Sequence, residues 1–312
     1  MILRKIFNPL AVVRYMHQEL IVSVVLSTGV YLLYSWQGLS FVGLPFSIAA
    51  ILGSALAIFL AFRNNNAYSR WWEARTVWGS IINNSRIFAR QIIANTDHAA
   101  ATGKATPEAV TACQQEMLYR QIAFAHALRL HLRKEEDATA YAHLLQPDEW
   151  TKAQQQQNIP NYLLLQQGKR IKEAMRTELL GAFDNISLEP TLAGFNNFQG
   201  SCERIKNTPL LRQDHYFTRL FLLAFMTILP FSLIGDFHKM GAPLLMVPVS
   251  ILISFVFGVM GKVGEVNEDP FENKITDVPL TALCTTLERD LKEMLGETDL
   301  PDKPVPVKGY LL

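Results

Sequence analysis

The chain has 312 residues, of which 49% are hydrophobic and 18% are charged, and its formal net charge is +1. A charge so close to zero creates no strong global field to recruit nucleic acid, so we expect no nucleic-acid partner. Apolar residues are concentrated towards the two ends of the chain, and the middle is polar. The three cysteines, Cys113, Cys202 and Cys284, form no CxxC pair, which predicts reduced, unpaired thiols.

The N-terminal third contains two uncharged apolar runs. Residues 1–19 mix basic and apolar side chains, which fits either an amphipathic segment at a membrane surface or a simple lead-in. Leu20–Trp36 ends in aromatic residues, as is typical where a helix reaches lipid headgroups. Leu44–Phe62 is about 19 residues long, enough to cross a bilayer core of about 30 Å. The uncharged link Gln37–Gly43 is short, so the two runs predict a transmembrane hairpin.

Arginines flank the ends of this hairpin that lie away from the link. They are Arg14 before the first run and Arg63, Arg70 and Arg75 after the second. The positive-inside rule therefore places the N-terminus and the chain from residue 63 onward in the cytoplasm.

A second hairpin follows near the C-terminal end. Tyr216–Gly235 and Gly241–Gly261 are apolar runs separated by the short link Asp236–Met240. Prolines within both runs are tolerated in membrane helices when neighbouring groups satisfy the freed carbonyls. Two hairpins place both termini on the cytoplasmic side.

The region between the hairpins is too polar for a membrane and shows no sustained strand alternation. Its periodicity predicts helices at Ala67–Ile93, Pro107–Arg133, Gly168–Phe183 and Leu192–Lys206, with loops at His98–Thr106, Gln146–Pro160 and Asp184–Pro190. After the second hairpin, Asp277–Gly296 has a leucine stripe typical of an amphipathic helix.

These elements predict an all-α membrane protein with four transmembrane helices and a large helical cytosolic region. The expected parts are an N-terminal segment and first hairpin (1–63), a cytosolic helical region (64–215), a second hairpin (216–261), an acidic motif with a C-terminal helix (262–296) and a flexible tail (297–312).

No motif for catalysis is present in the sequence. HExxH, GxSxG, the P-loop and a strand-linked GxGxxG are all missing, and the seven histidines are dispersed. We therefore expect neither an enzyme nor a resident metal or cofactor.

One helical face in the second apolar run has two interpretations. Ser54, Ile58 and Phe62 recur at intervals of four residues, at the inner end of the run. Such a face commonly packs against a neighbouring helix. Arranged around a symmetry axis, it would instead form a hydrophobic constriction that gates by dewetting.

Three stretches of the sequence together resemble the bacterial branch of the bestrophin family. They are Phe62–Arg86, Ser201–Leu210 and Glu268–Leu280. The resemblance implies a homopentameric ion channel with one axial pore. The family's neck positions then fall on Ser54, Ile58 and Phe62, and a second, cytosolic aperture falls on Ile186.

The chain departs from the family pattern in two places. Ser54 stands where relatives carry a larger apolar residue, which could partly hydrate the outer end of the neck. In the acidic motif, Asn and Pro replace two of the carboxylates that bind calcium in animal members. We therefore expect a structural role and no calcium gating for the remaining acidic residues, Glu268, Asp269 and Glu272.

The resemblance favours a bacterial inner-membrane channel that passes monovalent cations such as sodium. Its expected partners are these permeant ions, membrane lipid and further copies of itself. Two alternatives remain open: an anion (chloride) channel on the same scaffold, and a non-conducting membrane scaffold or regulator.

Overall fold

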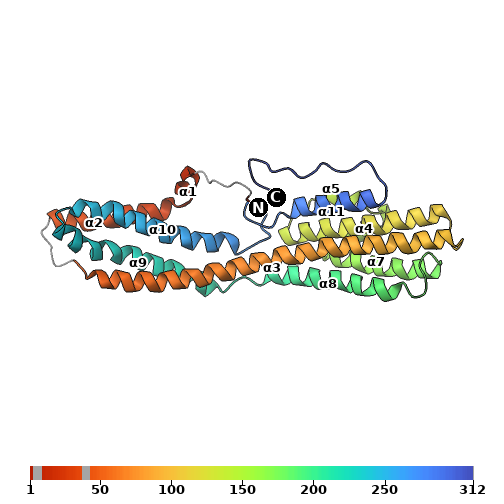
Figure 1. Ribbon diagram of the computed structural model, residues 1–312, viewed down its shortest axis with the longest axis horizontal. Coiled ribbons are helices and arrows are strands. Elements are labelled where there is room, and N and C mark those ends of the chain that lie inside the picture. Colours follow the sequence, from red (N-terminus) through yellow and green to blue (C-terminus); the bar gives the residue numbers. More distant parts are fainter. Residues whose placement is uncertain (3–8, 37–42, 312) are drawn as a thin grey trace. The chain divides into compact units, whose positions relative to one another are not determined.

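The computed structural model describes residues 1–2, 9–36 and 43–311, almost all of them in helices or short turns (Figure 1). The predicted link Gln37–Gly43, except for its last residue, and residues 3–8 of the predicted N-terminal segment lie outside this range. The helices are α1 (Pro9–Tyr15), α2 (His17–Trp36), α3 (Phe46–Ala101), α4 (Pro107–Arg133), α5 (Thr139–Ala142), α6 (Pro147–Ala153), α7 (Ile159–Arg176), α8 (Asn185–Asn207), α9 (Arg212–Lys239), the 3₁₀ turn η2 (Pro243–Leu245), α10 (Met246–Asn267) and α11 (Leu280–Met294).

The chain divides into two compact units. The membrane unit comprises Arg4–Arg70 and Pro209–Asp269, and the polar unit comprises Met1–Leu3, Trp71–Thr208 and Pro270–Leu312. Helix α3 contributes to both. Its 56 residues correspond to about 84 Å at ~1.5 Å per residue, far more than a bilayer core requires.

Four helices of the described chain are long and apolar enough to cross a membrane. They are found within His17–Ser35, Phe46–Ala101, Arg212–Lys239 and Pro243–Asn267. The predicted all-α class with four spans is confirmed. The described residues contain no strand, only isolated bridges in the terminal segments.

Small buried residues bring α2 and α10 together in the membrane unit. Ser23 and Ser27 are buried on α2, and Ser250 and Ser254 are buried on α10. A Cβ atom at Gly258 of α10 would lie 2.5 Å from Met16 Cε. Without a hydrophobic driving force in lipid, helix association depends on such close backbone packing.

Prolines account for several errors in the predicted element bounds. The predicted loop Gln146–Pro160 contains α6 and the start of α7, and Pro147 and Pro160 occupy first-turn positions, where a missing N–H costs nothing. The predicted loop Asp184–Pro190 is also wrong, because α8 begins at Asn185 and includes Pro190. One further error does not involve proline: the predicted link Asp236–Met240 is mostly the last turn of α9.

Other bounds in the polar region also differ from prediction. Helix α4 matches the predicted Pro107–Arg133. The predicted helix Gly168–Phe183 is displaced, because α7 starts nine residues earlier and ends at Arg176, followed by a turn in which Glu178 has a positive φ of 58°. Helix α3 runs through Ile93 and into the predicted loop His98–Thr106, ending at Ala101.

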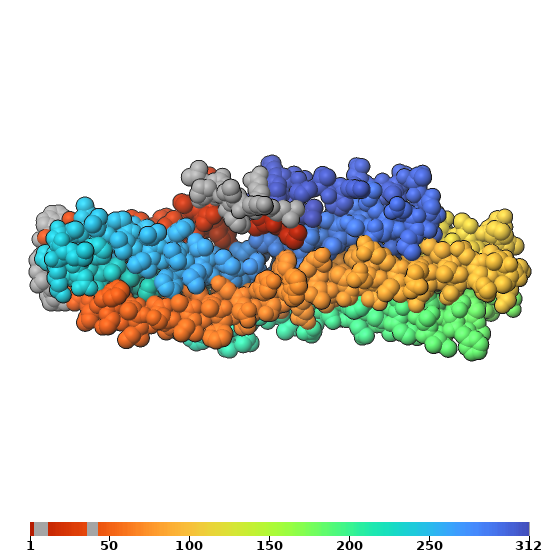
Figure 2. Space-filling view, in the orientation of Figure 1, coloured from red at the N-terminus to blue at the C-terminus, as the bar shows by residue number. Residues whose placement is uncertain are grey.

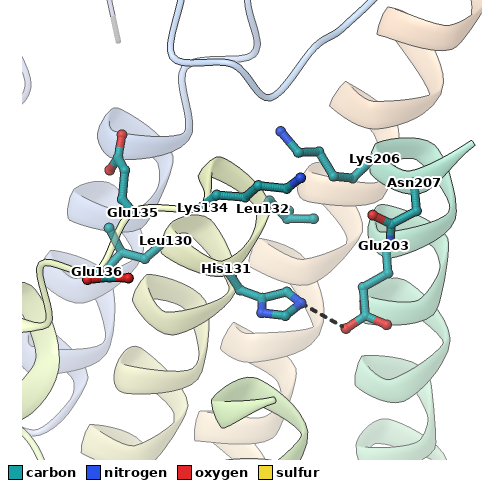
Figure 3. A pocket seen from close by; sticks show the side chains of 9 residues that line it. All are labelled: Leu130, His131, Leu132, Lys134, Glu135, Glu136, Glu203, Lys206 and Asn207. Atoms are coloured by element: carbon teal, nitrogen blue, oxygen red, sulfur yellow. Dashed lines mark ion pairs between the residues drawn. The ribbon is translucent and has the colours of Figure 1, made fainter. Parts of the chain in front are cut away.

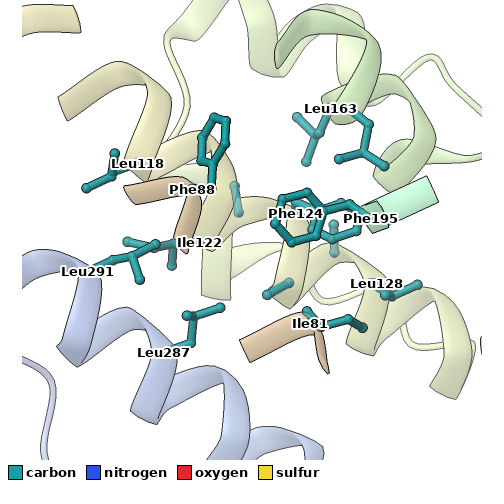
Figure 4. Packing of buried hydrophobic residues seen from close by; sticks show 14 of the residues in the cluster. Ile81, Phe88, Leu118, Ile122, Phe124, Leu128, Leu163, Phe195, Leu287 and Leu291 are labelled. Carbon is teal, nitrogen blue, oxygen red and sulfur yellow. The ribbon is translucent and has the colours of Figure 1, made fainter. Parts of the chain in front are cut away.

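The core of the polar unit is a cluster of aromatic and aliphatic side chains (Figure 4). Phe195 of α8 lies edge-on to Phe88 of α3, with ring centroids 6.3 Å apart, and 5.8 Å from Phe124 of α4. Leu287 and Leu291 of α11 are also fully buried in this cluster, as the predicted leucine stripe requires. One continuous core thus joins the second half of α3 to α4, α8 and α11.

Replacing Phe195 by alanine should lower the free energy of unfolding by about 3–5 kcal/mol, because the cavity left by the ring cannot collapse. Tryptophan fluorescence during thermal unfolding in detergent would measure the change. Phe183 is 80% exposed, so Phe183→Ala serves as the matched control and should shift stability by less than about 0.5 kcal/mol. Equal effects of the two substitutions would contradict this packing.

The three cysteines are free, in agreement with the predicted unpaired thiols, and the structure shows that all three are buried. Burial raises the pKa of the Cys284 thiol to about 12 and also raises the pKa values of Cys113 and Cys202. The thiolate is the reactive form, so native protein should resist maleimide labelling at pH 7.5. Mass spectrometry should find no label before denaturation and three labels after it. Rapid labelling of the native protein would contradict the burial.

Candidate functional site

The predicted neck residues lie on one exposed face of α3. Ile58 is 60% exposed and Phe62 is 68% exposed, and Ser54 is also exposed. The opposite face is buried against α9 and α10, with Leu56 and Leu60 at 3% and 0% exposure. Figure 2 shows that the other helices of the membrane unit leave one side of the first half of α3 (orange) uncovered. An apolar stripe therefore faces outward from the membrane unit.

Two details refine this face. The Ser54 hydroxyl donates a hydrogen bond to the carbonyl oxygen of Ala50 at 2.8 Å, so its proton is held by the helix backbone. Ile51, which the sequence reasoning missed, is 70% exposed. It precedes Ile58 by seven residues, or about two turns, and that spacing could have identified it.

A buried arginine fixes the rotation of α3. Arg63 is 6% exposed, and its guanidinium lies 3.3 Å from the Glu268 carboxylate of α10's C-cap. It also donates to the Gly261 carbonyl at 3.3 Å and lies 3.2 Å from His215 Nδ1. Neighbouring residues of an α-helix point about 100° apart, so this inward position of Arg63 fixes a rotation of α3 in which Phe62 faces outward.

The next residue adds a second contact between the same helices. Asn64 Nδ2 donates to the carbonyl oxygen of Met260 at 2.9 Å. This close approach depends on Gly264, because a Cβ atom there would collide with the Asn64 side-chain oxygen. The inner end of the apolar stripe is therefore anchored to α10 at two successive residues.

The acidic residues of the motif lie in different units and make separate contacts. Glu268 pairs with Arg63 in the membrane unit, and Asp269 is half-buried there. In the polar unit, Glu272 pairs with Lys206 at 2.5 Å. Asp277, which the sequence reasoning missed, is 2% exposed and accepts backbone N–H bonds from Glu272 and from Lys274. Within the described residues, no three His, Cys, Asp or Glu side chains form a group that could hold a metal ion.

The predicted aperture residue lies at the start of α8, in the polar unit. Ile186 is 73% exposed, whereas Leu188 in the same turn is fully buried. Pro190, four residues further on, has no N–H to donate, so the Ile186 carbonyl lacks its usual partner in the helix. Phe183, which the sequence reasoning also missed, is exposed just before this turn.

A cavity of about 410 Å³ lies in the polar unit near the ends of α4 and α8 (Figure 3). His131 faces Glu203 across it at 3.7 Å. Glu203 also accepts hydrogen bonds from Asn158 and Gln199. Among the described residues that line the cavity, none is a serine, threonine or cysteine that His131 could activate.

These features define a multi-pass, all-α membrane protein with an outward apolar stripe on one long helix. Residues 6–293 match the family model described as Bacterial/Fungal Bestrophin protein. The chain belongs to this family, as the sequence resemblance indicated.

Curated relatives and solved structures agree with this assignment. The chain is 34% identical over 279 residues to Voltage-dependent anion channel-forming protein YneE of Escherichia coli, covering 89% of this chain and 85% of that protein. It is 29% identical to Voltage-dependent anion channel-forming protein alr2987 of a Nostoc species, covering 78% and 77%. A bacterial Bestrophin homolog from Klebsiella pneumoniae superposes with a TM-score of 0.79 at 30% identity, covering 90% of this chain and 99% of that one. The family is one of channel-forming proteins and not of enzymes.

Breaking the Arg63–Glu268 pair should destabilise the membrane unit. Arg63→Met and Glu268→Gln should each lower the free energy of unfolding by about 2–3 kcal/mol, because each leaves a largely buried charge unpaired. The double variant should recover about 1–2 kcal/mol relative to the sum of the two. Denaturant titration in mixed micelles would measure all three.

The exposed pair Lys239–Asp236 provides the matched control for this cycle. Its side chains are 80% and 55% exposed, so Asp236→Asn should change stability by less than about 0.5 kcal/mol. Strict additivity of Arg63→Met and Glu268→Gln would show that the two side chains do not interact.

Proposed function

We propose that this chain is a subunit of a homopentameric ion channel with a single axial pore. The observation that carries the proposal is the outward apolar stripe of Ile58 and Phe62 on a helix long enough to span a membrane. Five such stripes around one axis form a hydrophobic neck, with Ser54 at its outer end. The names of the curated relatives, which call them channel-forming, add support.

The neck gates by dewetting in this proposal. Side chains without charge or polar atoms do not replace an ion's water, so a narrow ring of them excludes ions until it widens or fills with water. Ile186 forms a second apolar ring, the cytosolic aperture, and its exposure in the polar unit supports that role.

Monovalent cations such as sodium are the proposed permeant ions. The exposed stripe from Ile51 to Phe62 carries no basic side chain, and Arg63 next to it is buried and paired with Glu268. No ring of exposed positive charge on this stripe therefore attracts anions. An anion channel is the second candidate, favoured by the names of the relatives, which specify anions.

The proposed location is the bacterial inner membrane, with both termini in the cytoplasm, and the channel is not gated by calcium. Pairing of Glu268 with Arg63 and of Glu272 with Lys206 supports the structural role of the acidic motif. Two of its three carboxylates are already paired with basic side chains, which leaves few free oxygens for a cation that takes six to eight.

Truncating the neck tests conduction. In planar bilayers, Phe62→Ala and Ile58→Ala should each raise the open probability or conductance at least about threefold, because a wider, less apolar ring hydrates more easily. Leu252→Ala on α10, where the leucine is 62% exposed, is the matched control and should leave the currents unchanged. A non-conducting scaffold would show background flux in all four proteins.

The permeant ion is identified by the reversal potential under a salt gradient. A reversal potential near the sodium equilibrium potential is expected, since cation flux then dominates the current. Replacing chloride by a large impermeant anion should leave that potential unchanged. A reversal that follows the chloride gradient would establish the anion channel instead.

A further inference from the structure

The exposed face of α3 changes from apolar to polar directly after Phe62. Asn65, Asn66 and Ser69 are all exposed, three, four and seven residues beyond Phe62 in the same unbroken helix. At about 3.6 residues per turn, these offsets keep the three polar side chains on the face that Phe62 occupies. The apolar stripe therefore ends in one to two turns of uncharged polar groups.

The three consecutive asparagines differ in what they contact. Asn64 turns inward and donates to the Met260 carbonyl. The side chains of Asn65 and Asn66 are exposed and make no hydrogen bond to any described part of the chain. Asparagine is also a poorer helix former than alanine by about 0.5–0.7 kcal/mol. Neither packing nor helix stability within the subunit accounts for these two side chains.

The chemistry of this polar segment suits contact with ions in water. A carboxamide offers an acceptor oxygen and two N–H donors, and a serine hydroxyl offers both functions, so these groups can replace water around an ion of either sign. The formal charge nearest to Asn65 in sequence, on Arg63, is buried and paired with Glu268, while Arg70, directly after Ser69, is half-buried. Around Asn65 the exposed face therefore carries no formal charge of its own, and a charge added at this position would change the local field strongly.

We propose that Asn65, with Ser69 one turn further on, forms a polar ring at the inner end of the neck that rehydrates ions leaving the Phe62 constriction. In this role Asn65 is a specificity-determining residue for the ion that passes. The inference rests on the proposed pore along α3.

Charge substitutions at Asn65 test the ring through the cation-to-anion permeability ratio in planar bilayers. Asn65→Asp should raise the ratio at least about fivefold, because one carboxylate per subunit would surround the permeation path. Asn65→Lys should lower the ratio by a similar factor. Asn65→Leu should extend the apolar neck by one turn and reduce the single-channel conductance at least about threefold. All three changes are at an exposed position, where the fold tolerates them.

Asn161→Asp is the matched control, because Asn161 is an exposed asparagine on α7 and the substitution changes the net charge equally. It should leave the ratio within about twofold of wild type. If the wild type conducts, the Phe62→Ala channel shows increased currents and Asn65→Asp leaves the ratio unchanged, the ring is disproved while the pore stands. If the wild type does not conduct, both proposals fail.

Discussion

The buried Arg63–Glu268 pair is the contact on which the geometry of the membrane unit depends. Arg63 is only 6% exposed, so its guanidinium needs hydrogen-bond acceptors within the protein. The Glu268 carboxylate and the Gly261 carbonyl both lie 3.3 Å from it. Replacing only one of the two residues would destabilise the protein, since a buried charge without a partner costs several kcal/mol. With Arg63 held inward, α3 is rotated so that Phe62, about 100° around the helix, faces outward. One electrostatic requirement thus sets which face of α3 the membrane unit leaves exposed.

Much of the fold could be predicted from the sequence, since apolar runs about 20 residues long leave few alternatives to membrane helices. The helix bounds of the polar region were harder to predict, because a proline there can lie in a loop, in the first turn of a helix or inside a helix. Pro147 and Pro160 occupy first turns, and Pro190 lies inside α8. Periodicity cannot distinguish these cases, since the outcome depends on whether the missing N–H would have had a partner.

The candidate site shows the same limit. Spacing placed Ser54, Ile58 and Phe62 on one face, and their exposure agrees with that, but their role as a neck stays a prediction. Spacing could not reveal that Glu268 would meet Arg63, since the two residues are 205 positions apart. Asp277 was missed for a related reason: its carboxylate binds backbone N–H groups, and a backbone partner leaves no pattern in the side chains.

Pro190 affects the flexibility of the first turn of α8. The turn that carries Ile186 is held by one backbone hydrogen bond fewer than an ordinary first turn, while Leu188 anchors the next residues in the core. Ile186 therefore lies in a first turn that is more flexible than the rest of α8, which Leu188 fixes to the core. Thermal fluctuation at this point can change the position of one apolar side chain without disturbing the packing of the helix behind it.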